Sequence, residues 1–135
     1  METKNNQTRI TISLLWISVM FLMIFADIFS IIIELNDGDI MQIPMEVKTA
    51  MTIAAIVTAL PILMVILSWV LPYKINRLAN MIVGILSIIY VIGGGTSLPF
   101  YIIMAGIEVI LLITIIVISM KWEKAQIINQ LNVEL

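Results

Sequence analysis

The sequence predicts an all-α membrane protein, an up-down-up-down bundle of four transmembrane helices with both termini in the cytoplasm. Two observations indicate this class. Hydrophobic residues make up 61% of the 135 residues and charged residues only 12%, whereas a soluble domain carries about 25% charged residues. The apolar residues also fall into four long runs separated by short polar segments. A chain of this length has room for one domain, so we expect residues 1–135 to form a single membrane domain.

The four apolar runs predict transmembrane spans at about 10–34, 47–71, 77–93 and 100–120. Each run reaches or approaches the ~20 residues that a helix needs to cross about 30 Å of hydrocarbon, the third being the shortest. The first run is too long for the apolar core of a cleaved signal peptide, which has about 7–15 residues. We expect polar tails at 1–9 and 121–135, the second of which either extends the last helix, lies on the membrane surface or frays.

The basic residues predict the orientation of the bundle. Only Lys48 lies on the side of the loop between the first two spans. The other six all lie on the opposite side, namely Lys4, Arg9, Lys74, Arg77, Lys121 and Lys124. By the positive-inside rule that side is cytoplasmic. We therefore expect a multi-pass protein of the bacterial inner membrane, in which Lys74 and Arg77 set the topology and contact lipid phosphates.

Most polar, sulfur and indole side chains of the first span recur at helical spacing. They are Arg9, Ser13, Trp16, Met20, Met23, Asp27, Ser30 and Glu34. Residues three or four apart share one face of a helix, so this stripe is expected to face protein. Ile17, Leu22, Ile28 and Ile32 are expected to face lipid. Asp27 should lie on the inward side, because intramembrane acids almost always face the bundle interior.

Depth along each helix groups Asp27 with three residues of the other spans. At ~1.5 Å per residue, Thr58, Tyr90 and Glu108 lie about 20 Å from the cytoplasmic ends of their spans and Asp27 about 27 Å. No Lys or Arg lies within the spans at that depth. Because burial disfavours the charged form of a carboxyl, we expect Asp27 and Glu108 to be neutral or to share a proton. These four residues are the candidate substrate- or proton-binding site.

The sequence leaves several functions open. The acids indicate a proton- or cation-linked transporter, and the alternative is a structural or accessory subunit of a larger membrane complex. In that alternative, protonated carboxyls only form hydrogen bonds between helices. The chain has no Cys and no His, which excludes thiol nucleophiles, Cys/His zinc sites and His-ligated haem. We therefore expect no catalytic residue, metal or cofactor and no enzyme, although a membrane enzyme with an acid-only site stays open as a third class.

We expect the partners of the chain to be the lipid bilayer and either further copies of the chain or another membrane protein, but no nucleic acid. Near the turn between the second and third spans, Asn76 and Asn80 are expected to cap or cross-link helices.

Two stretches resemble an uncharacterised family of small bacterial four-helix membrane proteins, a domain of unknown function. They are "LLWISVMFLMIFADIFS" (14–30) and "LPYKINRLANMIVGIL" (71–86). The first matches the pattern Leu-Trp followed by aromatic-Ala-Asp, and the second matches Leu-Pro, Lys, Asn-Arg and a further Asn. The matching positions are Leu15, Trp16, Phe25, Ala26, Asp27, Leu71, Pro72, Lys74, Asn76, Arg77 and Asn80. The family often has Tyr where this chain has Phe25. The resemblance implies the four-helix fold and no particular activity.

Overall fold

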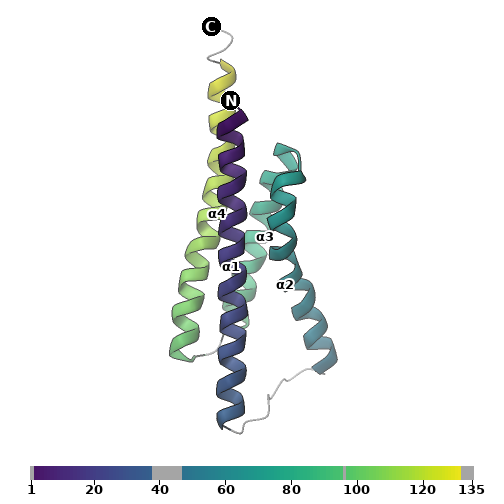
Figure 1. Cartoon of the computed structure of the whole chain (residues 1–135), viewed down its shortest axis with the longest axis vertical. Helices are drawn as coiled ribbons and strands as arrows, with labels where there is room; N and C mark the ends of the chain where they lie inside the picture. The colour runs from purple at the N-terminus through teal and green to yellow at the C-terminus, as the bar shows by residue number, and fades with distance from the viewer. Residues whose placement is uncertain (1, 38–46, 96, 132–135) are drawn as a thin grey trace.

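The computed structural model describes residues 2–37, 47–95 and 97–131, and over these residues it shows four helices and no strand (Figure 1). They are α1 (Glu2–Asp37), α2 (Val47–Val70), α3 (Tyr73–Gly93) and α4 (Pro99–Leu131). Each contains a stretch long and apolar enough to cross a membrane, namely Asn5–Ile33, Met51–Val70, Tyr73–Gly93 and Pro99–Trp122. The all-helical class is confirmed. Of the loop expected at 35–46, residues 38–46 lie outside the described residues.

The outer helices are longer than the hydrophobic spans. Both segments expected as polar tails are largely helical, because α1 begins at Glu2 and α4 continues to Leu131. The chain has no Gly or Pro before Gly38 or after Gly106, so nothing in these tails interrupts a helix. The turn between α2 and α3 is shorter than expected, because Pro72 directly precedes α3 with φ −61° and ψ 149°. That extended backbone ends one helix, and the next begins at once.

The helices alternate in direction. Figure 1 shows the N-terminal part of α1, the junction of α2 and α3, and the C-terminal part of α4 at the same end of the bundle. Helix α1 packs against α2 and α4, and α3 packs against the same two helices. The four helices thus form a ring in which α1 and α3 lie diagonally opposite each other.

Buried residues recur every three or four positions, the spacing of helices that pack nearly antiparallel. On α1 they are Ile12, Trp16, Val19, Met23 and Ala26; on α3 they are Asn76, Asn80, Gly84, Ser87 and Val91; on α4 they are Glu108, Leu112, Ile115, Ser119 and Trp122. The exposed large side chains are mostly Ile, Leu, Val and Phe. The interior thus combines large apolar side chains with Asn, Ser and Gly, while aliphatic residues cover the outside, as in a bundle that faces lipid.

The buried stripe of α1 is rotated relative to the prediction. Trp16 and Met23 are buried as expected, but Ala26 is buried in place of Asp27, which is exposed. Ser13 is buried, and its hydroxyl donates a hydrogen bond to the carbonyl oxygen of Val65 on α2 at 3.1 Å. Asp27 lies on the same side of α1, fourteen residues further along the helix. Its exposure therefore reflects the absence of α2 at that level, while the small Ala26 side chain allows close packing.

The bundle is closely packed at one end only. None of the described side chains of α1 after Ala26, of α2 before Pro61 or of α4 before Glu108 is buried. We call these segments the loop half and the remainder of the bundle the terminal half. Figure 1 shows α2 moving away from α1 toward its N-terminal end, within the loop half. Glu108 is the buried residue of α4 closest to this loosely packed region.

Candidate functional site

The terminal half is held together by a polar network that starts at the end of α2. The last carbonyls of a helix have no donor within that helix. Here the Arg9 guanidinium of α1 donates from Nη1 to the carbonyl oxygens of Ser68 and Trp69, at 3.2 and 2.6 Å. The negative end of the helix dipole also favours a cation at this place. Arg9, near the start of α1, therefore caps the C-terminal end of α2.

Two asparagines of α3 carry this network across the bundle. Asn76 donates from Nδ2 to the carbonyl oxygen of Ser68 at 2.7 Å. Asn80 donates from Nδ2 to the side-chain and backbone oxygens of Asn76, at 2.7 and 2.8 Å. Trp16 of α1 then donates from Nε1 to Asn80 Oδ1 at 2.6 Å, across the diagonal of the ring. The expectation that the asparagines cap and cross-link helices is confirmed, and the network joins α1, α2 and α3.

Trp122 connects α4 to the same end. Its ring packs edge-to-face against Tyr73 at 5.2 Å between centroids, and the Arg9 guanidinium carbon lies 5.8 Å from its ring centroid. The side chain is only 6% exposed. Such aromatic and cation–π contacts each contribute about 0.5–1.5 kcal/mol. Trp122 is therefore a packing residue between three helices.

Glu108 is the least satisfied ionisable group among the described residues. Its side chain is 3% exposed, and its Oε1 atom is buried without a hydrogen-bond partner. It continues the stripe of Leu112 and Ile115 on α4, so the helix turns the carboxyl into the bundle. A buried carboxyl without partners is costly in the charged form. Glu108 is therefore the candidate binding group of this region.

Asp27, Tyr90 and Tyr101 are the described residues that interact electrostatically with this carboxyl. Asp27 of α1 interacts electrostatically with Glu108, and both tyrosines interact electrostatically with both acids. Tyr101 also donates its hydroxyl to the carbonyl oxygen of Val91 at 3.0 Å, which fastens the start of α4 to α3. The structure thus brings together three of the four predicted residues and adds Tyr101. A sequence signal for Tyr101 exists, because it lies seven residues before Glu108 on the same helical face.

Thr58 is the predicted site residue whose bonding is confined to its own helix. Its hydroxyl donates to the carbonyl oxygen of Ala54 at 2.8 Å and lies 3.4 Å from that of Ala55. It stands three residues before the buried Pro61, in the part of α2 that has no buried side chain. Proline removes a helical hydrogen bond and clashes with the preceding turn, so it favours a bend at this point.

The exposed Asp27 and the buried Glu108 provide two carboxyls with different surroundings. Asp27 is exposed, whereas Glu108 is buried with an unpartnered oxygen. Among the described residues no group of three or more His, Cys, Asp or Glu is placed to hold a metal ion. The arrangement suits exchange of a proton or a weakly held monovalent cation better than tight coordination of a divalent metal.

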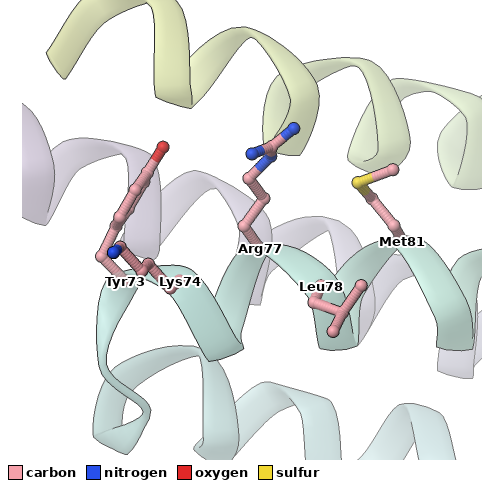
Figure 2. Close-up of a pocket in the computed structure, with 5 residues that line it drawn as sticks. All are labelled: Tyr73, Lys74, Arg77, Leu78 and Met81. Atoms are coloured by element: carbon pink, nitrogen blue, oxygen red, sulfur yellow. The ribbon is translucent and has the colours of Figure 1, made fainter. Parts of the chain in front are cut away.

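The two basic residues assigned to lipid contact lie at the other end of the bundle. Lys74 and Arg77 line a pocket of about 370 Å³ on α3, together with Tyr73, Leu78 and Met81 (Figure 2). Lys74 is exposed, and Arg77 is half-buried. This pocket is separate from the acid residues, so the two predicted groups of residues form two sites.

A family model described as a family of unknown function (DUF6326) matches residues 1–129. The chain therefore belongs to this family, which confirms the resemblance given by the motifs of α1 and of the α2–α3 turn. No curated protein and no solved structure matches the chain. The family description names no activity, so the function has to be argued from the geometry.

Proposed function

We propose that this member of the DUF6326 family is a small proton- or cation-linked membrane transporter whose binding group is the carboxyl of Glu108. The observation that carries the proposal is the burial of Glu108, 3% exposed, with no hydrogen-bond partner for Oε1. An isolated buried charge costs several kcal/mol, so such a carboxyl is most stable when a proton or a cation is bound to it. In membrane proteins, inward-facing acids mark ion and proton pathways.

Asp27 gives the proposed site its access. Its carboxyl interacts electrostatically with that of Glu108, and its side chain is exposed. The first half of α2 diverges from α1 toward its N-terminal end (Figure 1). An ion that exchanges between the two carboxyls passes from an exposed group to a buried one. No Lys or Arg lies between Arg9 and Lys48 or between Arg77 and Lys121, so no fixed basic residue within these segments competes for the acids.

Helix α2 supplies the element that opens and closes the site in this proposal. Its second half is fixed to α1 and α3 through the Ser68 carbonyl, while none of the described side chains of its first half is buried. Pro61 stands at the border between the two. Swinging of the first half toward α1 would cover Asp27 and separate the site from its surroundings, a hinge motion about a small number of residues.

Proton flux in vesicles tests the proposal. The full chain is reconstituted into liposomes that contain a pH-sensitive dye, and flux is measured under imposed pH, Na⁺ and K⁺ gradients. We expect one of these gradients to drive flux above that of empty liposomes. Glu108→Gln and Asp27→Asn should each reduce the flux at least tenfold, because both keep size and hydrogen bonding but cannot ionise. Thr114→Val is the matched control, since the Thr114 hydroxyl bonds only to Ile110 of its own helix.

Two outcomes overturn the proposal. One is the absence of flux under every gradient from a protein whose helical content and monodispersity are intact. The other is flux that survives both acid substitutions unchanged, which removes the carboxyls from any pathway.

The alternative, an accessory subunit, is favoured by one observation. Asp27 is exposed on a helix whose neighbouring residues Phe25, Ile28 and Phe29 are also exposed. A polar group from a partner helix would satisfy this carboxyl in the membrane. Purification in mild detergent from native membranes tests it. A stoichiometric partner lost on Asp27→Leu and retained on Asp27→Asn supports the subunit, and an isolated chain rejects it.

We further propose that both termini face the cytoplasm of a bacterial cell and that the protein lies in the inner membrane. Six of the seven basic residues are at the end that carries the start of α1 and the α2–α3 turn, or in α4 at and beyond Lys121. A phosphatase fused after Leu135 should be inactive and a fluorescent protein there should fold. The reverse result would invert the orientation.

A further inference from the structure

The pocket at the start of α3 combines a charged part and an apolar part in a fixed order. Tyr73, Arg77 and Met81 follow each other at four-residue intervals and extend toward α4, whereas Lys74 and Leu78 lie one residue further round the helix (Figure 2). The volume is about 370 Å³. The described residues that line the pocket are thus five side chains of α3, basic at the start of the helix and apolar one to two turns further on.

The position of the pocket relative to the apolar span matches this order. The candidate membrane span of α3 begins at Tyr73. At ~1.5 Å per residue, Leu78 and Met81 lie about 8 and 12 Å deeper than Tyr73. The basic groups thus lie at the level of lipid headgroups and the apolar groups at the level of acyl chains. Arg and Lys side chains near span ends place their charged heads at this level.

The two basic side chains of the pocket, Lys74 and Arg77, differ in the geometry with which they bind phosphate. Lys74 is an exposed, compact point charge, whereas the half-buried Arg77 carries a planar guanidinium with several N–H donors. An Arg fork and a Lys on one helical turn bind phosphate oxygens by two different geometries. Tyr73 adds an aromatic wall whose ring is held by Trp122 at 5.2 Å.

We infer that this pocket is a discrete binding site for one anionic phospholipid, with its phosphate between Lys74 and Arg77 and one acyl chain along Leu78 and Met81. The inference is independent of the acid site, because no residue is common to the two. It goes beyond a general attraction of basic residues to the membrane surface, which predicts no stoichiometry and no difference between basic residues at the same level.

Lipid binding to the full chain in a non-ionic detergent tests the inference. Native mass spectrometry follows titration with dioctanoyl phosphatidylglycerol, with dioctanoyl phosphatidylcholine, and with inorganic phosphate as a competitor. We expect one phosphatidylglycerol per chain and at least tenfold weaker binding of phosphatidylcholine. Lys74→Gln should weaken binding about fivefold, the weight of about one interfacial lysine. Met81→Trp should reduce it further by filling the apolar part.

Lys121→Gln is the matched control, because Lys121 is an exposed lysine of α4 that does not line the pocket. It should leave the affinity unchanged. Arg77→Lys keeps the positive charge and should retain part of the binding. Equal losses for Lys74→Gln and Lys121→Gln would show a diffuse surface charge, and equal affinity for the two lipids would show ordinary solvation by lipid. Displacement by millimolar inorganic phosphate would show a free-anion site instead. Each of these three results overturns the inference.

Discussion

The two halves of the bundle place polar groups inside a membrane protein in opposite ways. In the terminal half, Trp16, Asn76 and Asn80 are fully buried, and each makes a hydrogen bond of 2.6–2.8 Å. In the loop half and at its border, Asp27 is exposed and Glu108 is buried with an unpartnered oxygen. The first arrangement stabilises one structure, whereas the second leaves a buried carboxyl oxygen without a partner.

The comparison indicates how to separate structural from functional polar residues in a small membrane protein. The asparagines find all their partners within the protein, in the Ser68 carbonyl of α2, in the oxygens of Asn76 and in Trp16, so no ligand has to supply them. The hydroxyls of Ser68 and Ser119 also lack partners, but a neutral hydroxyl is far less costly to bury than a carboxyl that ionises. Glu108 therefore stands apart among these groups, because its burial demands a proton or a counter-ion.

The largest expected effect tests the satisfied half. Asn80→Leu removes the acceptor of Trp16 Nε1 and the donor to Asn76 Oδ1, leaving two buried groups unpaired. We expect the free energy of unfolding in mixed micelles, followed by circular dichroism, to fall by about 3 kcal/mol. Thr114→Val is the control and should change it by less than about 0.5 kcal/mol. Equal effects of the two substitutions would mean that the network contributes no stability.

A second substitution probes the packing between α3 and α4 in the terminal half. A Cβ atom on Gly84 would lie 3.0 Å from Cγ1 of Ile116, so a larger side chain forces the helices apart. Gly84→Leu should therefore lower the free energy of unfolding by about 2 kcal/mol. Gly106 has nothing within 4 Å of the same position, and Gly106→Leu is expected to be neutral within about 0.5 kcal/mol. If both glycines tolerate leucine equally, the close approach at Gly84 does not exist.

The third substitution should act in the opposite direction. Glu108→Leu replaces a buried carboxyl that has an unpartnered oxygen with an apolar side chain of similar size. We expect the free energy of unfolding to rise by about 1 kcal/mol, because stability is gained where function requires a costly group. A decrease of similar size would show instead that the carboxyl bonds to another helix, which is the structural interpretation of the acids.

The sequence predicted the four helices well, because long apolar runs without charge have few other structures in a membrane. It predicted Trp16, Asn76 and Asn80 as interior residues from their type and spacing. It did not predict that Arg9 bonds to Ser68 and Trp69, since the acceptors are backbone carbonyls that carry no sequence signal. Such a contact depends on the packing of two helices that are far apart in the sequence.

The position of Asp27 was not predictable for a different reason. A helical stripe fixes which residues share a face to within about one residue, and Ala26 and Asp27 are neighbours around the helix. Ala26 is the one that is buried, because its small side chain allows a neighbouring helix to pack closely. Asp27 is exposed, because α2 diverges from α1 toward its N-terminal end. Depth estimates placed Asp27, Tyr90 and Glu108 at similar levels, since rise per residue is constant along a helix, and their grouping into one site stays a prediction.

The smallest expected effect concerns Thr58, the remaining member of the predicted group. Valine has nearly the shape of threonine, and the only bonds that it removes are those of the Thr58 hydroxyl to carbonyl oxygens of its own helix. Thr58→Val should therefore change the free energy of unfolding by less than about 0.5 kcal/mol and the proton or cation flux by less than twofold. The same liposomes and micelles measure both quantities. A tenfold loss of flux without loss of stability would place Thr58 with the acids. Because its helix has to approach α1 for the hydroxyl to reach Asp27, that result would also show that α2 closes over the site during transport.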